Sequence, residues 1–255
     1  MAEKDNFIAV FDSGVGGISV LRHLRRIMPG ERYLYYGDSA NAPYGPRTTE
    51  EIRQLSLAVA EKVLAQGCKA LVVACNTATS AAIDTLRQKY PETIIIGIEP
   101  ALKPAVDRFP SGCIGVLATQ TTLREEKFHK LMEHYAQHCQ VLRLPAPGLV
   151  ELIEQGKADS EEAKNLLCTI LAPHLGKLDA LVLGCTHYPF VADTLRGILG
   201  ESVLLLDGGE GTARETKRRL ESAGLLHNGT GEILWQNSRN DPEIIALCQT
   251  LLEKE

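Results

Sequence analysis

The hydrophobic pattern of the chain is a regular alternation of short apolar runs and longer amphipathic stretches. In the first part, the apolar runs cover residues 7–11, 33–36, 70–74 and 93–97. Runs of this length, bounded by polar and turn residues, are typical of strands buried on both faces. Between them, apolar residues recur every three or four positions, which predicts helices. Strands that alternate with helices indicate an α/β fold with parallel sheets.

The same pattern restarts roughly 105 positions further on. The later apolar runs cover residues 113–117, 140–144, 180–183 and 202–206. We therefore expect an α/β fold of two similar doubly wound domains with mainly parallel sheets, related by pseudo-symmetry. A last strand at 232–235 and a terminal helix have no counterpart in the first part, and we expect them to return to it. The expected domains are 1–97 plus 208–255, and 98–207.

Two cysteines occupy the same position in the two repeats. Cys75 follows the run 70–74 and Cys185 follows the run 180–183, 110 positions apart. A helical pattern comes after each, so we expect both thiols at the end of a strand and the start of a helix. Ligands of open parallel sheets bind at such strand ends. A helix N-terminus lowers the pKa of a thiol below its reference value of about 8.5. Two such thiols, facing each other, suggest proton removal on one face of a carbon and delivery on the other.

Other interpretations of these residues stay open. A free cysteine usually packs as a small apolar residue, and we interpret Cys68, Cys113, Cys139, Cys168 and Cys248 in that way. The loop 12–17 (Asp-Ser-Gly-Val-Gly-Gly) is either a tight strand-to-helix turn or a cleft-lining loop. It lacks the spacing of a dinucleotide-binding loop and the lysine of a P-loop. His187 either orients the Cys185 thiol or has a structural role.

Composition and charge exclude several classes of protein. The net charge of −5, without a basic run, argues against nucleic-acid binding. The N-terminus lacks a signal-peptide pattern and no apolar run is long enough for a membrane span, so we expect a cytoplasmic protein without a membrane partner. The seven cysteines include no CxxC pair, and no histidine motif accompanies them. We therefore expect neither disulfides nor a metal, whereas the absence of a cofactor is implied only by the family resemblance described next.

Four short motifs, in this order, resemble the cofactor-independent aspartate/glutamate racemase family, and within it the glutamate-specific members. They are 12–17, 43–45 (Pro-Tyr-Gly), 75–77 (Cys-Asn-Thr) and 184–189 (Gly-Cys-Thr-His-Tyr-Pro). Each motif is weak alone, but the four in order, with both cysteines, are highly specific and span nearly the whole chain.

The resemblance implies roles for particular residues. Cys75 and Cys185 would be the acid/base pair, Cys75 taking the α-proton from the D enantiomer and Cys185 from the L enantiomer. The residues implied to bind or orient the amino acid are Asp12, Ser13, Tyr44, Gly45, Asn76, Thr77, Thr186 and His187. Thr119 and Thr122 correspond to threonines near the substrate carboxylate, and Glu151 to a carboxylate that supports catalysis.

The function implied by the resemblance is conversion of L-glutamate to D-glutamate for peptidoglycan synthesis, and hence for cell-wall biogenesis and cell shape. The expected partner is glutamate itself, with the active site in the cleft between the two domains and a homodimer as the assembly. A racemase or isomerase for a related substrate, such as aspartate or a hydantoin, stays open as an alternative. So does an amino-acid or nucleotide binding module without turnover.

Overall fold

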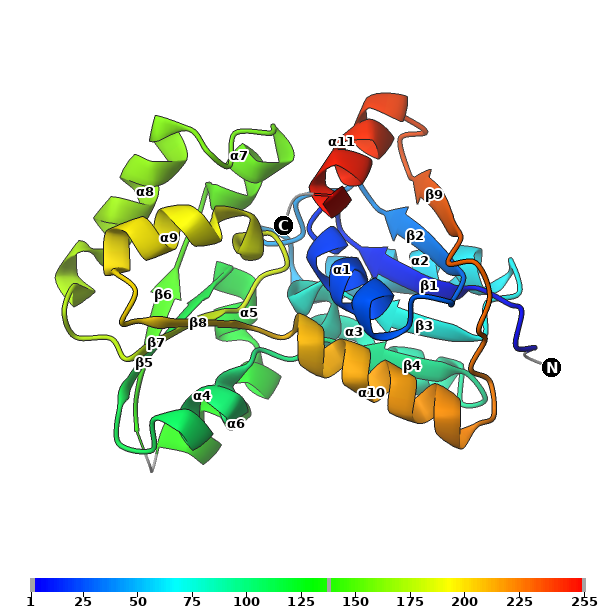
Figure 1. The fold of residues 1–255 in the computed structure, drawn as a ribbon, viewed down its shortest axis with the longest axis horizontal. Helices are drawn as coiled ribbons and strands as arrows, with labels where there is room; N and C mark the ends of the chain where they lie inside the picture. Colours follow the sequence, from blue (N-terminus) through cyan, green and yellow to red (C-terminus); the bar gives the residue numbers. More distant parts are fainter. Residues whose placement is uncertain (1–2, 137–138, 254–255) are drawn as a thin grey trace. The chain divides into compact units, whose positions relative to one another are not determined.

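The protein, here a computed structural model, is described over residues 3–136 and 139–253 and divides into two compact units (Figure 1). The first unit ends at Glu99 and resumes at Gly209, and the second runs from Pro100 to Gly208. Within the described residues, no helix has the length and apolar character needed to cross a membrane.

The first unit is built on a five-stranded sheet whose strand pairs are all parallel. Its strands are β1 (Ile8–Asp12), β2 (Tyr33–Gly37), β3 (Ala70–Val73), β4 (Ile94–Gly97) and β9 (Ile233–Asn237), in the order β4-β3-β1-β2-β9. Strand β9 pairs with β2, so the C-terminal part of the chain returns to the first unit.

Helices cover both faces of this sheet. One layer holds α1 (Ile18–Ile27), α10 (Gly209–Ser222) and α11 (Pro242–Glu253), because α1 packs against the other two. The other layer holds α2 (Thr49–Leu64) and α3 (Asn76–Lys89), which pack against each other. A capping box begins α2: the Thr48 N–H donates to Glu51 Oε2 at 2.9 Å, and the Glu51 N–H donates to Thr48 Oγ1 at 3.3 Å.

The second unit repeats the plan with a four-stranded parallel sheet. Its strands are β5 (Cys113–Ala118), β6 (Gln140–Pro145), β7 (Ala180–Leu183) and β8 (Leu204–Asp207). Its helices are α4 (Leu102–Arg108), α5 (Gln120–Arg124), α6 (Glu126–Ala136), α7 (Leu149–Glu154), α8 (Glu161–Leu171) and α9 (Ala192–Leu199), with 3₁₀ turns η1 (Ala172–His174) and η2 (Tyr188–Val191). Separate apolar cores fill the two faces of the sheet.

The strand order confirms the predicted fold class and its internal repeat. The order β4-β3-β1-β2 in one sheet corresponds, strand for strand, to β8-β7-β5-β6 in the other. In both sheets the chain passes from the first strand to a neighbour on one side, then crosses to the other side. Such a reversal opens a crevice at the carboxyl ends of the two central strands, which are β1 and β3 in one unit and β5 and β7 in the other.

A buried ion pair joins several segments of the first unit. Lys69 Nζ lies 2.6 Å from Glu31 Oε2, and both side chains are fully buried. The ammonium group also donates to the carbonyl oxygens of Lys4 (2.6 Å) and Leu225 (3.0 Å), and Glu31 Oε1 accepts from the backbone N–H of His227 (2.8 Å). The pair therefore fastens the returning segment to the chain that leads into β2 and β3.

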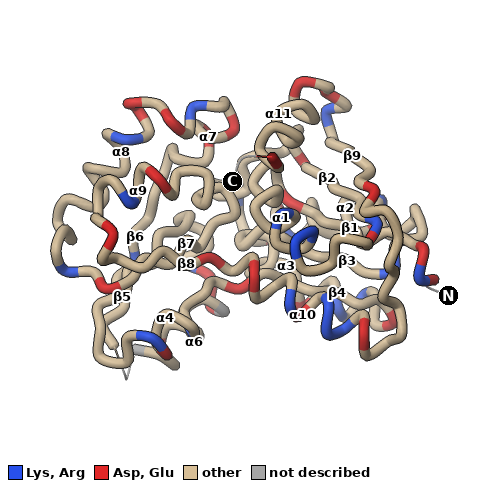
Figure 2. Tube along the Cα trace, viewed as in Figure 1, with Lys and Arg blue, Asp and Glu red and all other residues tan. Residues whose placement is uncertain are grey.

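Exposed charges have a smaller structural role. Basic and acidic residues are interspersed along α10, as Figure 2 shows, and they form pairs one turn apart. Arg214 lies 2.7 Å from Glu210, and Arg218 lies 2.7 Å from Glu215. Exposed helical pairs of this kind contribute about 0.3–0.5 kcal/mol each, so packing against α1 carries most of the stability of this helix.

Candidate active site

Cys75 lies where β3 ends and α3 begins, as the sequence predicts. It is the N-cap residue of α3, with its side chain 5% exposed. The sulfur accepts a hydrogen bond from the backbone N–H of Ala78 at 3.4 Å. The free N–H groups and the dipole of a helix N-terminus favour negative charge, so this position stabilises a thiolate.

The neighbouring strand brings Asp12 and Ser13 to the same edge of the sheet. Asp12 ends β1 and is fully buried, and its Oδ1 accepts from the backbone N–H of Gly14 at 2.9 Å. Ser13 Oγ lies 3.6 Å from Cys75 Sγ. A side chain at Gly17 would place Cβ 2.6 Å from Asp12 Cβ, which explains the glycine there. The crevice between β1 and β3 thus holds a thiol, a hydroxyl and a carboxylate.

Asn76 and Thr77 form the first turn of α3 and are buried. Neither the amide nitrogen nor the amide oxygen of Asn76 has a hydrogen-bond partner among the described residues. Buried polar atoms are almost always paired, and leaving one unpaired costs about 1–3 kcal/mol. An unpaired amide beside Cys75 therefore points to an external polar group that it binds.

Tyr44 is hydrogen-bonded to Asp38, a carboxylate that lies outside the four sequence motifs. Its hydroxyl donates to Asp38 Oδ2 at 2.7 Å, and Asn41 Nδ2 lies 3.1 Å from both oxygens of Asp38. Burial, together with the negative charge of Asp38, raises the pKa of Tyr44 far above its ordinary value, so its hydroxyl stays protonated. Gly45 follows Tyr44 in the loop and is half-buried.

Cys185 follows β7, but no α-helix starts there, so this part of the expectation was wrong. The chain forms the 3₁₀ turn η2 first, and α9 begins only at Ala192. The cause is Pro189. In the first unit, the N–H of Thr79 donates to the carbonyl oxygen of Cys75, four residues earlier, at 2.9 Å. Proline has no N–H, so the Cys185 carbonyl instead accepts from Tyr188, three residues on, at 3.1 Å.

An imidazole takes the place of the missing helix at Cys185. His187 is almost fully buried, with Nδ1 3.7 Å from Cys185 Sγ and Nε2 2.6 Å from Glu154 Oε1. Burial lowers the pKa of His187, but the hydrogen bonds to Cys185 and Glu154 and the negative charge of Glu154 outweigh it, so the pKa is raised well above 6.5. In the protonated ring both nitrogens donate, one to the sulfur and one to the carboxylate. The cation therefore stabilises a thiolate at Cys185.

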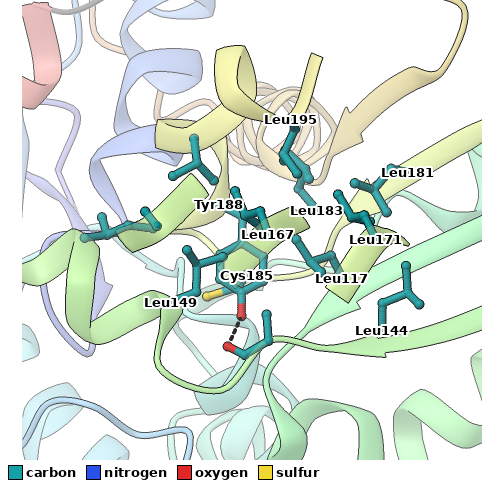
Figure 3. Close-up of a cluster of buried hydrophobic side chains, with 14 of the residues drawn as sticks. Leu117, Leu144, Leu149, Leu167, Leu171, Leu181, Leu183, Cys185, Tyr188 and Leu195 are labelled. Atoms are coloured by element: carbon teal, nitrogen blue, oxygen red, sulfur yellow. Dashed lines mark hydrogen bonds between the residues drawn. The ribbon is translucent and has the colours of Figure 1, made fainter. Parts of the chain in front are cut away.

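Apolar side chains surround the second thiol. Figure 3 shows Cys185 among Leu149, Leu183 and Tyr188. The Tyr188 hydroxyl donates to the carbonyl oxygen of Ala146 at 3.4 Å. The other side of the site is polar, since Thr186 is buried and its Oγ1 lies 3.5 Å from Nδ1 of His187.

The remaining candidates fall into two groups. Thr119 follows β5, the strand beside β7, and its buried hydroxyl lies 3.0 Å from that of Thr122 and caps α5. These threonines occupy the place in the second sheet that Ser13 has in the first.

Glu151 lies on α7 with its side chain exposed, one turn before the half-buried Glu154. The carboxylate that contacts His187 is that of Glu154, which lies outside the four sequence motifs.

Within residues 3–136 and 139–253, no cluster of three or more His, Cys, Asp or Glu side chains could hold a metal ion.

The chain is similar to known proteins over most of its length. The Asp/Glu/hydantoin racemase family model matches residues 16–216. The chain is 49% identical over 253 residues to the glutamate racemase of Clostridium perfringens (strain SM101 / Type A), covering 98% of this chain and 97% of that protein.

Two solved structures show the similarity of the fold. The glutamate racemase of Thermus thermophilus in complex with β-chloro-D-alanine is 35% identical, with a TM-score of 0.82 over 99% of this chain and 94% of that one. The glutamate racemase of Francisella tularensis in complex with D-glutamate is 26% identical, with a TM-score of 0.86 over 99% and 95%.

Proposed function

The chain belongs to the Asp/Glu/hydantoin racemase family, and from this premise we propose that it interconverts L-glutamate and D-glutamate by proton transfer at the α-carbon. The observation that carries the proposal is the pair of buried thiols at equivalent strand ends, each beside a group that stabilises its anionic form. Whole-chain similarity to glutamate racemases supports glutamate as the substrate.

Racemisation requires a proton to leave one face of the α-carbon and another to arrive on the opposite face. A single base tends to return the proton to the face from which it came, so two groups are needed. In the proposed mechanism one cysteine is a thiolate and the other a thiol when substrate binds. Cys75 removes the proton from the D enantiomer and Cys185 removes it from the L enantiomer. Their protonation states exchange in each turnover.

The two thiolates are stabilised by different means. The backbone N–H of Ala78 and the hydroxyl of Ser13 face Cys75, whereas the imidazolium of His187 faces Cys185. Glu154 holds that ring and compensates its charge. A charge-assisted hydrogen bond is roughly twice as strong as a neutral one, so each arrangement favours the thiolate needed to remove a proton.

Buried polar groups at the strand ends are proposed to bind the amino acid. The unpaired amide of Asn76 is the strongest of these, because it has donors and an acceptor without a partner in the described part of the chain. We assign Asp12, Ser13, Tyr44, Gly45, Thr77, Thr186 and His187 to the same task, with Thr119 and Thr122 in support. Charge that moves onto the substrate carboxylate as the proton leaves would be stabilised by such preorganised donors.

The wider role proposed here follows from the reaction. The D-glutamate formed would supply peptidoglycan synthesis in the cytoplasm, and the enzyme would act as a homodimer. Sedimentation equilibrium of the purified chain tests the dimer, and a monomer at micromolar concentration would contradict it.

Incubation of the purified chain with L-glutamate in deuterated water, without added cofactor, tests the reaction. We expect deuterium at the α-carbon and D-glutamate as the product, at rates well above those with aspartate or a hydantoin. A faster reaction with one of the latter would reassign the substrate. Tight binding of glutamate without exchange would instead indicate a binding module.

Single alanine substitutions test the two thiols. Cys75→Ala and Cys185→Ala should each abolish racemisation while circular dichroism shows a folded chain. Cys68→Ala and Cys168→Ala are matched controls, one in each unit, because both residues are free cysteines away from the carboxyl ends of the strands. Substantial turnover in either of the first two variants would refute the two-base mechanism.

A further inference from the structure

A buried tyrosine on β2 holds the turn that follows β1. The Tyr35 hydroxyl donates a hydrogen bond to the carbonyl oxygen of Gly14 at 2.7 Å, and the side chain is 1% exposed. Its ring packs against Trp235 of β9, with centroids 5.9 Å apart. Packing against Trp235 holds the Tyr35 ring in place. The Tyr35 hydroxyl can therefore hold the Gly14 carbonyl in position through its hydrogen bond.

The same peptide segment is also held from other directions. The N–H of Gly14 donates to Asp12 Oδ1 at 2.9 Å. Gly37, at the end of β2, allows the turn to approach closely, because a Cβ there would lie 2.6 Å from the Gly14 carbonyl oxygen. Ser13 stands between two residues whose polar groups are anchored, so little freedom remains in its backbone.

These contacts lead from β2 to the first thiol. Ser13 Oγ lies 3.6 Å from Cys75 Sγ, and a hydroxyl at this position donates to the sulfur when the thiolate forms. We propose that Tyr35 is a positioning residue for Cys75, because through Gly14 it keeps the Ser13 hydroxyl within reach of the thiol. The inference rests on the proposed role of Cys75 as an acid/base group.

Tyr33 provides a matched control on the same strand. It lies two residues before Tyr35, so both side chains project to the same face of the sheet. Its buried hydroxyl donates to the carbonyl oxygens of Leu24 (3.0 Å) and Met28 (2.9 Å), at the end of α1. Tyr33→Phe therefore removes a buried tyrosine hydroxyl at a distance from the turn that carries Ser13.

Alkylation by iodoacetamide at pH 7 reads the state of each thiol directly. Mass spectrometry of the Cys75 and Cys185 peptides gives the two rates separately in the wild type, Tyr35→Phe and Tyr33→Phe. We expect Tyr35→Phe to slow labelling of Cys75 by about tenfold, the effect of one hydrogen bond to a charged group. Labelling of Cys185 should be unchanged, and Tyr33→Phe should change neither rate. Equal effects of the two substitutions on Cys75 would overturn the proposal.

Steady-state racemisation of glutamate gives a second measurement. A displaced group beside the acid/base thiol lowers the rate more than it weakens binding, so Tyr35→Phe should reduce kcat by about 10- to 100-fold and raise KM by a smaller factor. If the wild type does not exchange the α-proton of glutamate, the proposed function fails, and the labelling experiment still decides the positioning role of Tyr35.

A double substitution separates positioning from general loosening. If Tyr35 acts through Ser13, Tyr35→Phe should add nothing to the slower Cys75 labelling of Ser13→Ala. Additive effects would show that Tyr35 acts by another route and would refute the proposal. Ser13→Ala alone leaves the bond between Tyr35 and Gly14 in place, so it remains informative if Tyr35→Phe folds poorly. Unchanged Cys75 labelling in Ser13→Ala would also refute the proposal.

Discussion

His187 and Glu154 lie 2.6 Å apart, Nε2 to Oε1, although 33 positions separate them in the sequence. The other ring nitrogen faces the Cys185 sulfur at 3.7 Å. In this arrangement the carboxylate fixes the orientation of the ring and favours its charged form, and the ring in turn favours the thiolate.

Glu154→Gln should therefore impair catalysis while Glu151→Gln should not. The first substitution removes the charge that stabilises the imidazolium, and we expect kcat/KM to fall at least tenfold, as for the loss of a charged hydrogen bond of about 1.5–3 kcal/mol. Glu151 is a matched control, because it lies one turn earlier on α7 with an exposed side chain. Kinetics in both directions measure the effect. A larger loss in Glu151→Gln would support the role that the family resemblance gives to Glu151.

The raised pKa of His187 predicts a dependence of stability on pH. In the unfolded chain the imidazole titrates at about 6.5, and in the folded chain at a higher pH, because Glu154 and Cys185 favour its charged form. The folded state then binds more protons above pH 6.5, so this contribution to stability is complete below about 6.5 and is lost as pH rises through the folded pKa. Urea unfolding from pH 6 to 9 should show a falling free energy of unfolding in the wild type. The slope should be flatter in Glu154→Gln, and parallel curves would contradict this account.

Asn76→Leu should reduce activity without reducing stability. The amide is buried without a protein partner in the described part of the chain, so an apolar side chain of similar size removes an unfavourable burial. We expect the free energy of unfolding to stay constant or rise by about 1 kcal/mol. The value of kcat/KM should fall about 100-fold, which is typical for the loss of a preorganised donor. A destabilised variant with normal kinetics would indicate a structural role for Asn76.

Two glycines whose numbers differ by 100 should respond in opposite directions to alanine. A Cβ at Gly97, at the end of β4, would lie 2.6 Å from Thr79 Cγ2 and 3.0 Å from Ile83 Cδ1. Such overpacking costs about 1–3 kcal/mol, so Gly97→Ala should be destabilising. At Gly197, within α9, the added methyl group meets open space, and alanine should stabilise the helix by about 0.5–1 kcal/mol. Urea titration of both variants measures the difference.

The buried pair of Lys69 and Glu31 should be more sensitive to the loss of one partner than of both. Lys69→Met leaves the fully buried carboxylate of Glu31 without its cation, which costs about 3–5 kcal/mol. The double variant Lys69→Met/Glu31→Gln removes both charges and keeps an acceptor for the N–H of His227, so it should regain part of this loss. If the double variant is less stable than Lys69→Met alone, the charge of Glu31 must be stabilised by a group other than Lys69.

The fold was predictable because its signals are local and repeated. The apolar run that became β3 and the run that became β7 are each buried along their whole length. The sequence could not give the order of the strands, because the pairing of β9 with β2 joins residues about 200 positions apart.

The candidate site was less fully predictable, for a physical reason in each case. Cys75 and Asn76 could be placed because they directly follow a buried strand. The absence of an α-helix start at Cys185 depends on Pro189, which has no N–H to donate to the Cys185 carbonyl oxygen. Glu151 and Glu154 lie on the same helix, and only the packed structure shows which carboxylate meets His187.

The different surroundings of the two thiols have a consequence for a reversible reaction. Mirror-image substrates have equal free energies in water, so the specificity constants of the forward and reverse reactions must be equal in any such enzyme. Turnover numbers are not bound by this equality. Cys75 faces a backbone N–H and a hydroxyl, neither of which carries a charge. Cys185 faces an imidazolium, which loses its charge as pH rises through its raised pKa. At alkaline pH and saturating substrate, the turnover number of one direction should therefore fall more than that of the other. A duplicated scaffold thus yields two half-reactions whose rates can be adjusted separately.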